Sequence, residues 1–168
     1  MAIKDVDRTD EVLKRLQELE SMSVKVGILS SSSGEMLMIA NVHEFGCDIP
    51  VTNKMRVFFL HNFGTWIKKD VIKIPERSFI RSSFDDKKDS VEETGENLIT
   101  QVVEGQLGAR NFYEMLGQTC VQVIKEFITA GISPANTNLT IQNKNGKSTP
   151  LIDSGRLINA IDYEIVGG

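Results

Sequence analysis

The feature that most constrains the fold of this chain is a stretch from Phe112 to Ile128 in which apolar residues recur at helical spacing. One face carries Phe112, Leu116, Cys120, Val123 and Phe127, flanked by Tyr113, Ile124 and Ile128. This pattern predicts an amphipathic helix that buries one side against another layer of the domain. Gly131 ends the pattern, and Pro134 prevents the helix from restarting.

Two further helices are predicted. A long one begins at Phe79 and Ile80, after Pro75 ends the preceding strand. Its apolar positions are Ile80, Phe84, Val91, Leu98 and Val102, and its acidic positions are Asp85, Asp86, Glu92, Glu93 and Glu96. An acidic face of this kind is usually a solvated helix surface. Near the N-terminus, Thr9 is a plausible N-cap for a helix with Val12, Leu16 and Leu19 on one side.

Strands are predicted in four places. Apolar residues alternate with polar residues or glycine over Val24–Ile28 and Ile161–Ile165. Two apolar runs, Met55–Leu60 and Val71–Ile74, are interpreted as an antiparallel pair joined by a hairpin loop, His61–Trp66. Met36, Ile39, Ala40 and His43 predict a short helix that ends at Gly46. The expected fold is therefore α+β, a small antiparallel sheet of three or four strands packed by two long helices plus the N-terminal helix.

The length and charge of the chain set its broad class. At 168 residues, a single domain over residues 1–168 is expected. Residues 135–150 are mostly polar and predict an exposed loop. The charged stretch from Lys4 to Asp10 predicts no signal peptide, and no apolar run approaches the ~20 residues of a membrane-spanning helix. A formal net charge of −4 argues against binding of nucleic acid through bulk charge.

No residue pattern predicts a catalytic, cofactor-binding or metal site. The only cysteines, Cys47 and Cys120, are expected to be free thiols. His43-Glu44 lacks the second histidine of an H-E-x-x-H zinc motif. The only other histidine is His61, so nucleophilic catalysis lacks a recognisable base. A small enzyme built on His43, Glu44 and Cys47 is the rival interpretation from a different class.

A mildly basic zone surrounds the run Val71–Ile74. It comprises Lys68, Lys69, Lys73, Arg77, Arg81, Lys87 and Lys88, interleaved with Asp70, Glu76, Asp85 and Asp86. A nucleic-acid-binding adaptor would use these cations on phosphates. Phe63 and Trp66 at the expected hairpin tip are a stronger indication, because exposed aromatic side chains on a loop often anchor an interface. The alternative is that Trp66 folds back onto the core.

Four segments of the chain resemble, in their order, the tail-completion or neck proteins of tailed bacteriophages. They are VKVGIL from Val24, IANVHEFG from Ile39, IPERSFIR from Ile74 and TPLIDSGRLINAI from Thr149. The lambdoid tail-completion family and the Mu-type virion morphogenesis family both fit, over about Val24 to Ile165. Ser78 stands where these families often have proline, and Ser154 where threonine is usual.

The resemblance implies a virion structural protein without enzymatic activity, metal or cofactor. It implies a ring of self-copies, a hexamer or a dodecamer, at the top of the tail, made in the bacterial host cytoplasm. Its neighbours would be head-closure or connector proteins and tail terminator or tail tube proteins. DNA would pass through the lumen without specific binding, and an acidic helix face would suit that lumen. A tail terminator or head-closure protein of the same junction is the nearest alternative.

The resemblance also assigns architectural roles to the motifs. His43, Glu44, Phe45 and Gly46 would fix the short helix, Pro75, Arg77 and Phe79 would orient the long helix, and Asp153, Gly155, Arg156 and Leu157 would set the last helix and strand. A closed ring needs two different complementary patches on each subunit. The interface candidates are Phe63, Trp66, Asn143, Lys144, Asn145, Lys147, Asp153 and Arg156.

Overall fold

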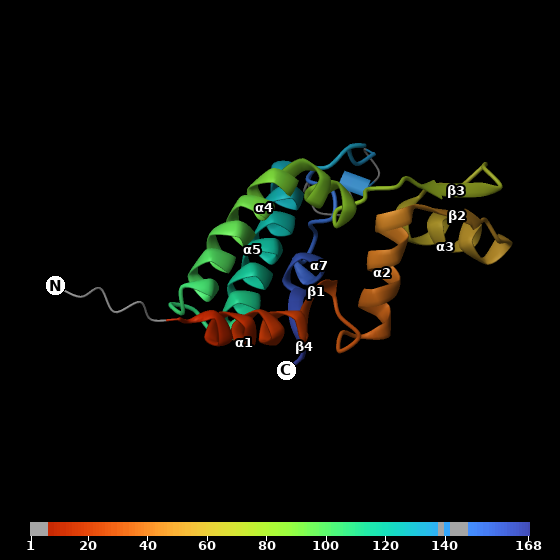
Figure 1. Ribbon diagram of the computed structural model, residues 1–168. Coiled ribbons are helices and arrows are strands. Elements are labelled where there is room, and N and C mark those ends of the chain that lie inside the picture. The colour runs from red at the N-terminus through yellow and green to blue at the C-terminus, as the bar shows by residue number, and fades with distance from the viewer. Residues whose placement is uncertain (1–6, 138–139, 142–147) are drawn as a thin grey trace.

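The computed structural model describes residues 7–137, 140–141 and 148–168 (Figure 1). Its elements are α1 (Thr9–Glu20), β1 (Met22–Ile28), α2 (Gly34–Phe45), β2 (Cys47–Pro50), α3 (Asn53–Phe63), β3 (Val71–Ile74), α4 (Arg81–Val103), α5 (Ala109–Ala130), α7 (Arg156–Asn159) and β4 (Ile161–Gly167). The α+β class is confirmed, with long helices beside short antiparallel strands.

Within the described residues, the four strands form two separate pairs and not a single sheet. β1 pairs antiparallel with β4, from Met22 opposite Gly167 to Ile28 opposite Ile161. β2 pairs antiparallel with β3, from Cys47 opposite Ile74 to Pro50 opposite Val71. The strands predicted over Val24–Ile28 and Ile161–Ile165 are both confirmed. They pair with each other although they lie near opposite ends of the chain.

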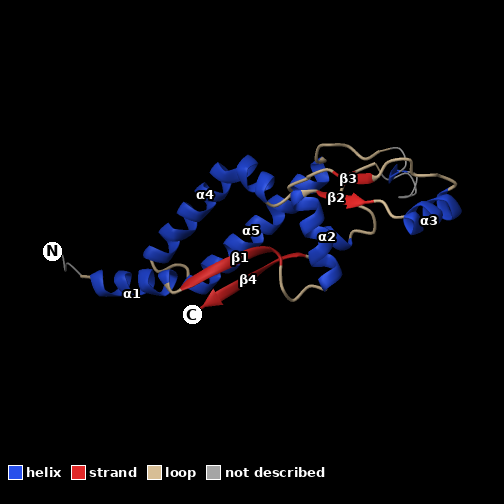
Figure 2. Ribbon diagram, turned by 90° about the vertical axis from the view of Figure 1, so that its right-hand side faces the viewer, coloured by secondary structure: helices blue, strands red, loops and turns tan. Residues whose placement is uncertain are grey.

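The body of the protein is built on the β1–β4 pair, α4 and α5 (Figure 2). Its main core surrounds Phe79, which is completely buried. The other buried members of this core are Met36, Ala40, Ile124, Ile128, Ile132, Leu151, Leu157 and Ile161. Residues from α2, α5, α7 and β4 therefore meet around the residue that precedes α4, and burial of these side chains is the main force holding the body together.

A second core lies where α1 meets the C-terminal end of α4 and the N-terminal end of α5. Its buried members are Leu19, Leu98, Val102, Ala109 and Phe112. The Tyr113 hydroxyl donates a hydrogen bond of 2.9 Å to the carbonyl oxygen of Leu19, which ties α1 to α5. The helix begins at Thr9 itself, and Arg8 occupies the N-cap position that the sequence had suggested for Thr9.

The predicted strand over Met55–Leu60 is wrong, because these residues lie in helix α3. Thr52 is the N-cap, and its hydroxyl accepts a hydrogen bond of 3.3 Å from the backbone nitrogen of Met55. Gly64 ends the helix in the left-handed conformation, at a φ of 62°. An apolar run of this length is compatible with either a strand or a helix, and here the two caps decide for the helix.

The hairpin expected between Met55–Leu60 and Val71–Ile74 is accordingly replaced by a different one. β3 pairs with β2, and α3 is inserted between them. We call residues 47–74, which comprise β2, α3 and β3, the arm, and the remaining described residues the body. Figures 1 and 2 both show the arm extending away from the body at the end opposite α1.

Candidate interaction surfaces

The base of the arm is fixed by a buried carboxylate. Glu44 is the penultimate residue of α2, and its side chain is only 7% exposed. Its two carboxylate oxygens accept hydrogen bonds from the backbone nitrogens of Ile80 and Arg81, at 3.0 and 3.1 Å. These donors are at the N-terminus of α4, where unpaired N–H groups and the helix dipole favour a negative charge. Glu44 therefore caps a helix that begins 37 residues further along the chain, at Arg81.

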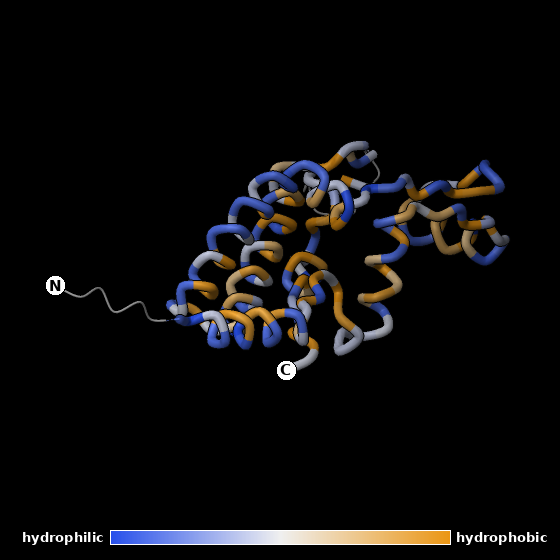
Figure 3. Tube along the Cα trace, in the orientation of Figure 1, coloured by the Kyte–Doolittle hydropathy of each residue, from blue (hydrophilic) through white to orange (hydrophobic). Residues whose placement is uncertain are grey.

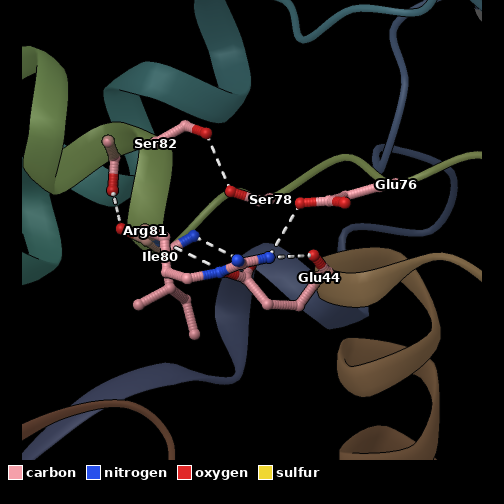
Figure 4. A network of polar contacts seen from close by, with 7 residues as sticks. Glu44, Glu76, Ser78, Ile80, Arg81 and Ser82 are labelled. Carbon is pink, nitrogen blue, oxygen red and sulfur yellow. Dashed lines mark hydrogen bonds and ion pairs between the residues drawn. The ribbon is translucent and has the colours of Figure 1, made fainter.

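Arg81 completes this network, which Figure 4 shows from close by. Its Nε atom donates to Glu44 Oε1 at 3.1 Å, and its Nη2 atom donates to the Glu44 carbonyl and to Glu76 Oε1, both at 2.8 Å. The hydrogen bond to Glu44, with the nearby charge of Glu76, raises the pKa of Arg81. The guanidinium also lies 4.8 Å from the centre of the Phe45 ring. The side chain of Arg81 is therefore already hydrogen-bonded to Glu44 and Glu76 of the same chain.

Arg77 ties the same region to the segment that follows α5. Its Nε and Nη2 atoms donate to the carbonyl oxygens of Pro134 and Ala135, at 2.8 and 3.2 Å. Its backbone nitrogen donates to the carbonyl oxygen of His43 at 2.7 Å. Burial lowers the pKa of Arg77. The motifs IANVHEFG and IPERSFIR therefore meet in space, and their polar residues orient α4 and its neighbours.

Gly46 makes the turn from α2 into the arm. Its φ is 71°, and a Cβ atom built there would lie 2.9 Å from the backbone nitrogen of Glu76. Only glycine fits such a left-handed position at such a close approach. Within the arm, Arg56 donates to the carbonyl oxygen of Ile67 and pairs with Asp70 at 2.8 Å. The arm is therefore held at its base and across its middle.

The outer helix of the arm is apolar and exposed. No residue of α3 is buried. Val57, Phe58, Leu60 and Phe63 of α3, together with Trp66, are between 41% and 60% exposed. Figure 3 shows apolar residues (orange) over much of the arm. Phe58 and Phe63 are stacked edge to face at 6.1 Å between ring centres, and Phe59 contacts both. A cluster of large apolar side chains left in water is typical of a surface that contacts a partner.

The body carries an apolar groove of about 510 Å³ between β1, α4 and α5. Val24 and Val26 of β1, Phe84 and Val91 of α4, and Cys120 and Val123 of α5 are among its lining residues. Phe84, one of the apolar positions predicted for the long helix, is 49% exposed and lines the groove. Asp85 also lines the groove, beside the acidic face predicted for α4.

The two predicted candidates in the last part of the chain lie together. Asp153 and Arg156 both line a hollow of about 210 Å³ beside α2. Arg156 makes a bidentate ion pair with Glu35, at 3.2 and 3.0 Å. The hydrogen bonds from Arg156 lower the pKa of Glu35. α7 begins after Gly155, which occupies the N-cap position with a φ of 82°.

The remaining candidates divide between the arm and an undescribed segment. Phe63 ends α3 and Trp66 follows it, so both lie on the arm, although not at a hairpin tip. Asn143, Lys144, Asn145 and Lys147 lie outside the described residues. Sequence reasoning missed Val57, Phe58 and Leu60, because it assigned them to a strand. The caps Thr52 and Gly64 are the signal that would have found them.

The described residues offer neither a metal-binding cluster nor a membrane-spanning helix. Within residues 7–137, 140–141 and 148–168, no group of three or more His, Cys, Asp or Glu side chains is placed to hold a metal ion. In the same part of the chain, no helix is long and apolar enough to cross a bilayer. Cys47 and Cys120 are free thiols, and burial raises the pKa of Cys120.

Comparison of the chain with protein-family models, with curated proteins and with solved structures found no match to any of them.

Proposed function

We propose that this protein is a structural component of a bacteriophage neck, a ring of identical copies that completes the tail and joins it to the head. The observation that carries the proposal is the arm, whose helix α3 has no buried residue and exposes Val57, Phe58, Leu60 and Phe63. A soluble monomer rarely leaves such a surface uncovered. In a ring, neighbouring copies would cover these exposed apolar side chains, and the surface would serve as an assembly interface.

The four segments that resemble neck proteins supply the second support. In the structure, Glu44 of α2 binds the start of α4 through the backbone of Ile80 and the side chain of Arg81. Arg77 binds the segment that follows α5. Phe79 is the centre of the main core. Residues with such positions set the shape of a subunit, which is the role that the resemblance implies for them.

The acidic side of α4 supports the same proposal. α4 contains six Asp or Glu residues against three Lys or Arg residues. If this face lined the lumen of a ring, it would repel DNA phosphates and let the duplex slide. We therefore propose a ring through which DNA passes without specific contacts.

Two alternative functions are a different protein of the same head–tail junction and a nucleic-acid-binding adaptor. A tail terminator or head-closure protein of the same junction would use the same surfaces against different neighbours. A nucleic-acid-binding adaptor would use the basic zone around β3, and here the geometry is less favourable. Arg77 and Arg81 of that zone already bind carbonyl or carboxylate oxygens of their own subunit.

The test is mass measurement by light scattering on the purified protein, alone and mixed with phage tails that lack this component. We expect either a ring-sized mass or a monomer that binds tail ends and restores joining to heads. Binding to DNA that weakens steeply with salt would favour the adaptor instead. A monomer that ignores both tails and heads would overturn the proposal.

A further inference from the structure

We propose that the arm of one copy docks in the groove between β1, α4 and α5 of the next copy. This inference rests on the proposed ring, and it names the two patches through which neighbouring subunits meet. The arm supplies the exposed side chains Phe58, Phe63 and Trp66. The groove supplies an apolar hollow with Asp85 of α4 among its lining residues.

The groove has the size and lining for aromatic side chains. A dry apolar cavity of roughly 150 Å³ holds one benzene ring, and this groove measures about 510 Å³. Val24, Val26, Val91 and Val123 give it apolar walls. Two or three aromatic rings would therefore fit, and they would lose contact with water on both sides of the interface.

The charges of the two parts are complementary. The arm, residues 47–74, holds five Lys or Arg residues against two Asp residues, a net charge of +3. The other 140 residues hold 14 against 21, a net charge of −7. At the groove itself the charged lining residues are Arg81 and Asp85 of α4, and Arg81 is already paired with Glu44 and Glu76. The apolar lining of the groove and the opposite net charges of arm and body therefore favour the arm of a second copy as the occupant.

The arrangement makes the contact intermolecular. Figures 1 and 2 show that the arm extends beyond α2, away from the body that contains the groove. The base of the arm is held by Glu44 and Gly46, so it does not turn back freely. Each copy would thus offer one arm and one groove. Contacts between two different patches propagate head to tail, and they form a ring when the rotation closes.

A single contact of this kind is weak. Three half-exposed aromatic side chains and two aliphatic ones offer on the order of 400–500 Å² of apolar area. A stable interface buries roughly 800 Å² on each partner. We therefore expect isolated pairs to be transient, and closure of the ring or a tail surface to stabilise them. The test must trap the contact covalently.

The native Cys120 lies in the groove and provides the trap. One protein carries Cys47→Ser, Cys120→Ser and Phe63→Cys, so that its only thiol is on the arm. The other carries Cys47→Ser alone, so that its only thiol is in the groove. The two are mixed, oxidised mildly, and analysed by peptide mass spectrometry, in solution and on tails that lack the protein. A disulfide between residues 63 and 120 can form only between copies.

Two controls make the result specific. Met38→Cys replaces Phe63→Cys in a matched arm protein, since Met38 is exposed on α2, outside the arm. We expect this variant to give a background yield of the linked peptide. Charge reversal supplies the second control, because Lys54 is on α3 and Asp85 lines the groove. Lys54→Glu or Asp85→Lys alone should lower the yield about two- to five-fold, and mixing the two variants should restore it.

Each outcome has a separate meaning. A linkage between residues 63 and 120 above the Met38→Cys background, with restoration by the charge swap, supports the arm-in-groove contact. Ring-sized particles, or protein bound to tails, without this linkage overturn the contact and leave the proposed neck function standing. Absence of the linkage together with absence of self-association and of tail binding overturns both.

Discussion

Replacing Glu44 by glutamine tests how far a single buried carboxylate stabilises the junction between α2, the arm and α4. The side chain keeps its size and loses its charge. The carboxylate accepts three hydrogen bonds, two from backbone nitrogens of Ile80 and Arg81 and one from Arg81 Nε. An amide has one acceptor oxygen, so its NH₂ group would face a donor. At least one of these bonds must be lost.

The expected loss of stability follows from these contacts. A hydrogen bond to a buried charged group contributes about 1.5–3 kcal/mol. Loss of the negative charge at the N-terminus of α4 removes about 0.3–1 kcal/mol more. We expect Glu44→Gln to lower the free energy of unfolding by about 2–4 kcal/mol. For a domain of this size, that corresponds to a fall in Tm of very roughly 4–16 °C.

The matched control is Glu76→Gln. Glu76 also binds Arg81, at 2.8 Å, but its side chain is exposed. Exposed ion pairs contribute about 0–1 kcal/mol, so this variant should unfold nearly like the wild type. Urea denaturation at neutral pH measures both, with an unchanged m-value showing that the denatured state is comparable. A loss below about 1 kcal/mol for Glu44→Gln, or no larger than that of Glu76→Gln, would refute the reasoning.

Two further predictions concern a packing contact and an ion pair. A Cβ atom at Gly117 would lie 2.5 Å from the Tyr163 ring, so Gly117→Ala should destabilise by about 1–3 kcal/mol despite its better helix propensity. Gly95→Ala in α4 meets nothing within 4 Å and should stabilise by about 0.5–1 kcal/mol, and thermal unfolding of both variants checks the sign. The pKa of Glu35 lies below its ordinary value because of Arg156, and it should rise in Arg156→Ala, as followed by an NMR titration. Because the pKa of Glu35 is lower in the folded protein, the pair stabilises the fold at a pH above the pKa that Glu35 has in the unfolded chain. This stabilisation is lost as the pH falls through the pKa of Glu35 in the folded protein. An unchanged pKa in Arg156→Ala would contradict this pairing.

The parts of the fold that the sequence predicts best are those in which the pattern is local. The apolar pattern from Phe112 to Ile128 and the alternation in β1 and β4 each lie within one element, and the structure confirms the helix and both strands. The buried face of the helix is rotated towards Ile124 and Ile128, which were predicted only to flank it. The pairing of β1 with β4 joins opposite ends of the chain. No local pattern indicates a partner at that distance. The α+β class is therefore confirmed, but the strands form two separate pairs and not the single sheet of three or four strands that was predicted.

The errors at the candidate site have the same origin. The run Met55–Leu60 is apolar throughout, so its composition could not separate a buried strand from an exposed helix. The sequence indicated Glu44 as a neighbour of His43 in an incomplete metal motif, and the resemblance implied that it fixes the short helix. Its actual partners, the backbone nitrogens at the start of α4, can be recognised only when α2 and α4 are placed together. Phe84 followed the apolar spacing of its helix, yet it lies at the groove.

The closed base of the arm has a consequence for how this chain can change. Cys47 and Ile74 are paired across the first rung of the arm, so the body meets the whole insertion as one loop whose two ends are already side by side. Closing a loop of doubled length disfavours folding by only about 0.6 kcal/mol. The outer segment can therefore be exchanged, shortened or extended with little effect on the body. Substitutions confined to this outer segment could therefore change the partner that the arm binds, while the junction at Glu44 keeps the body folded.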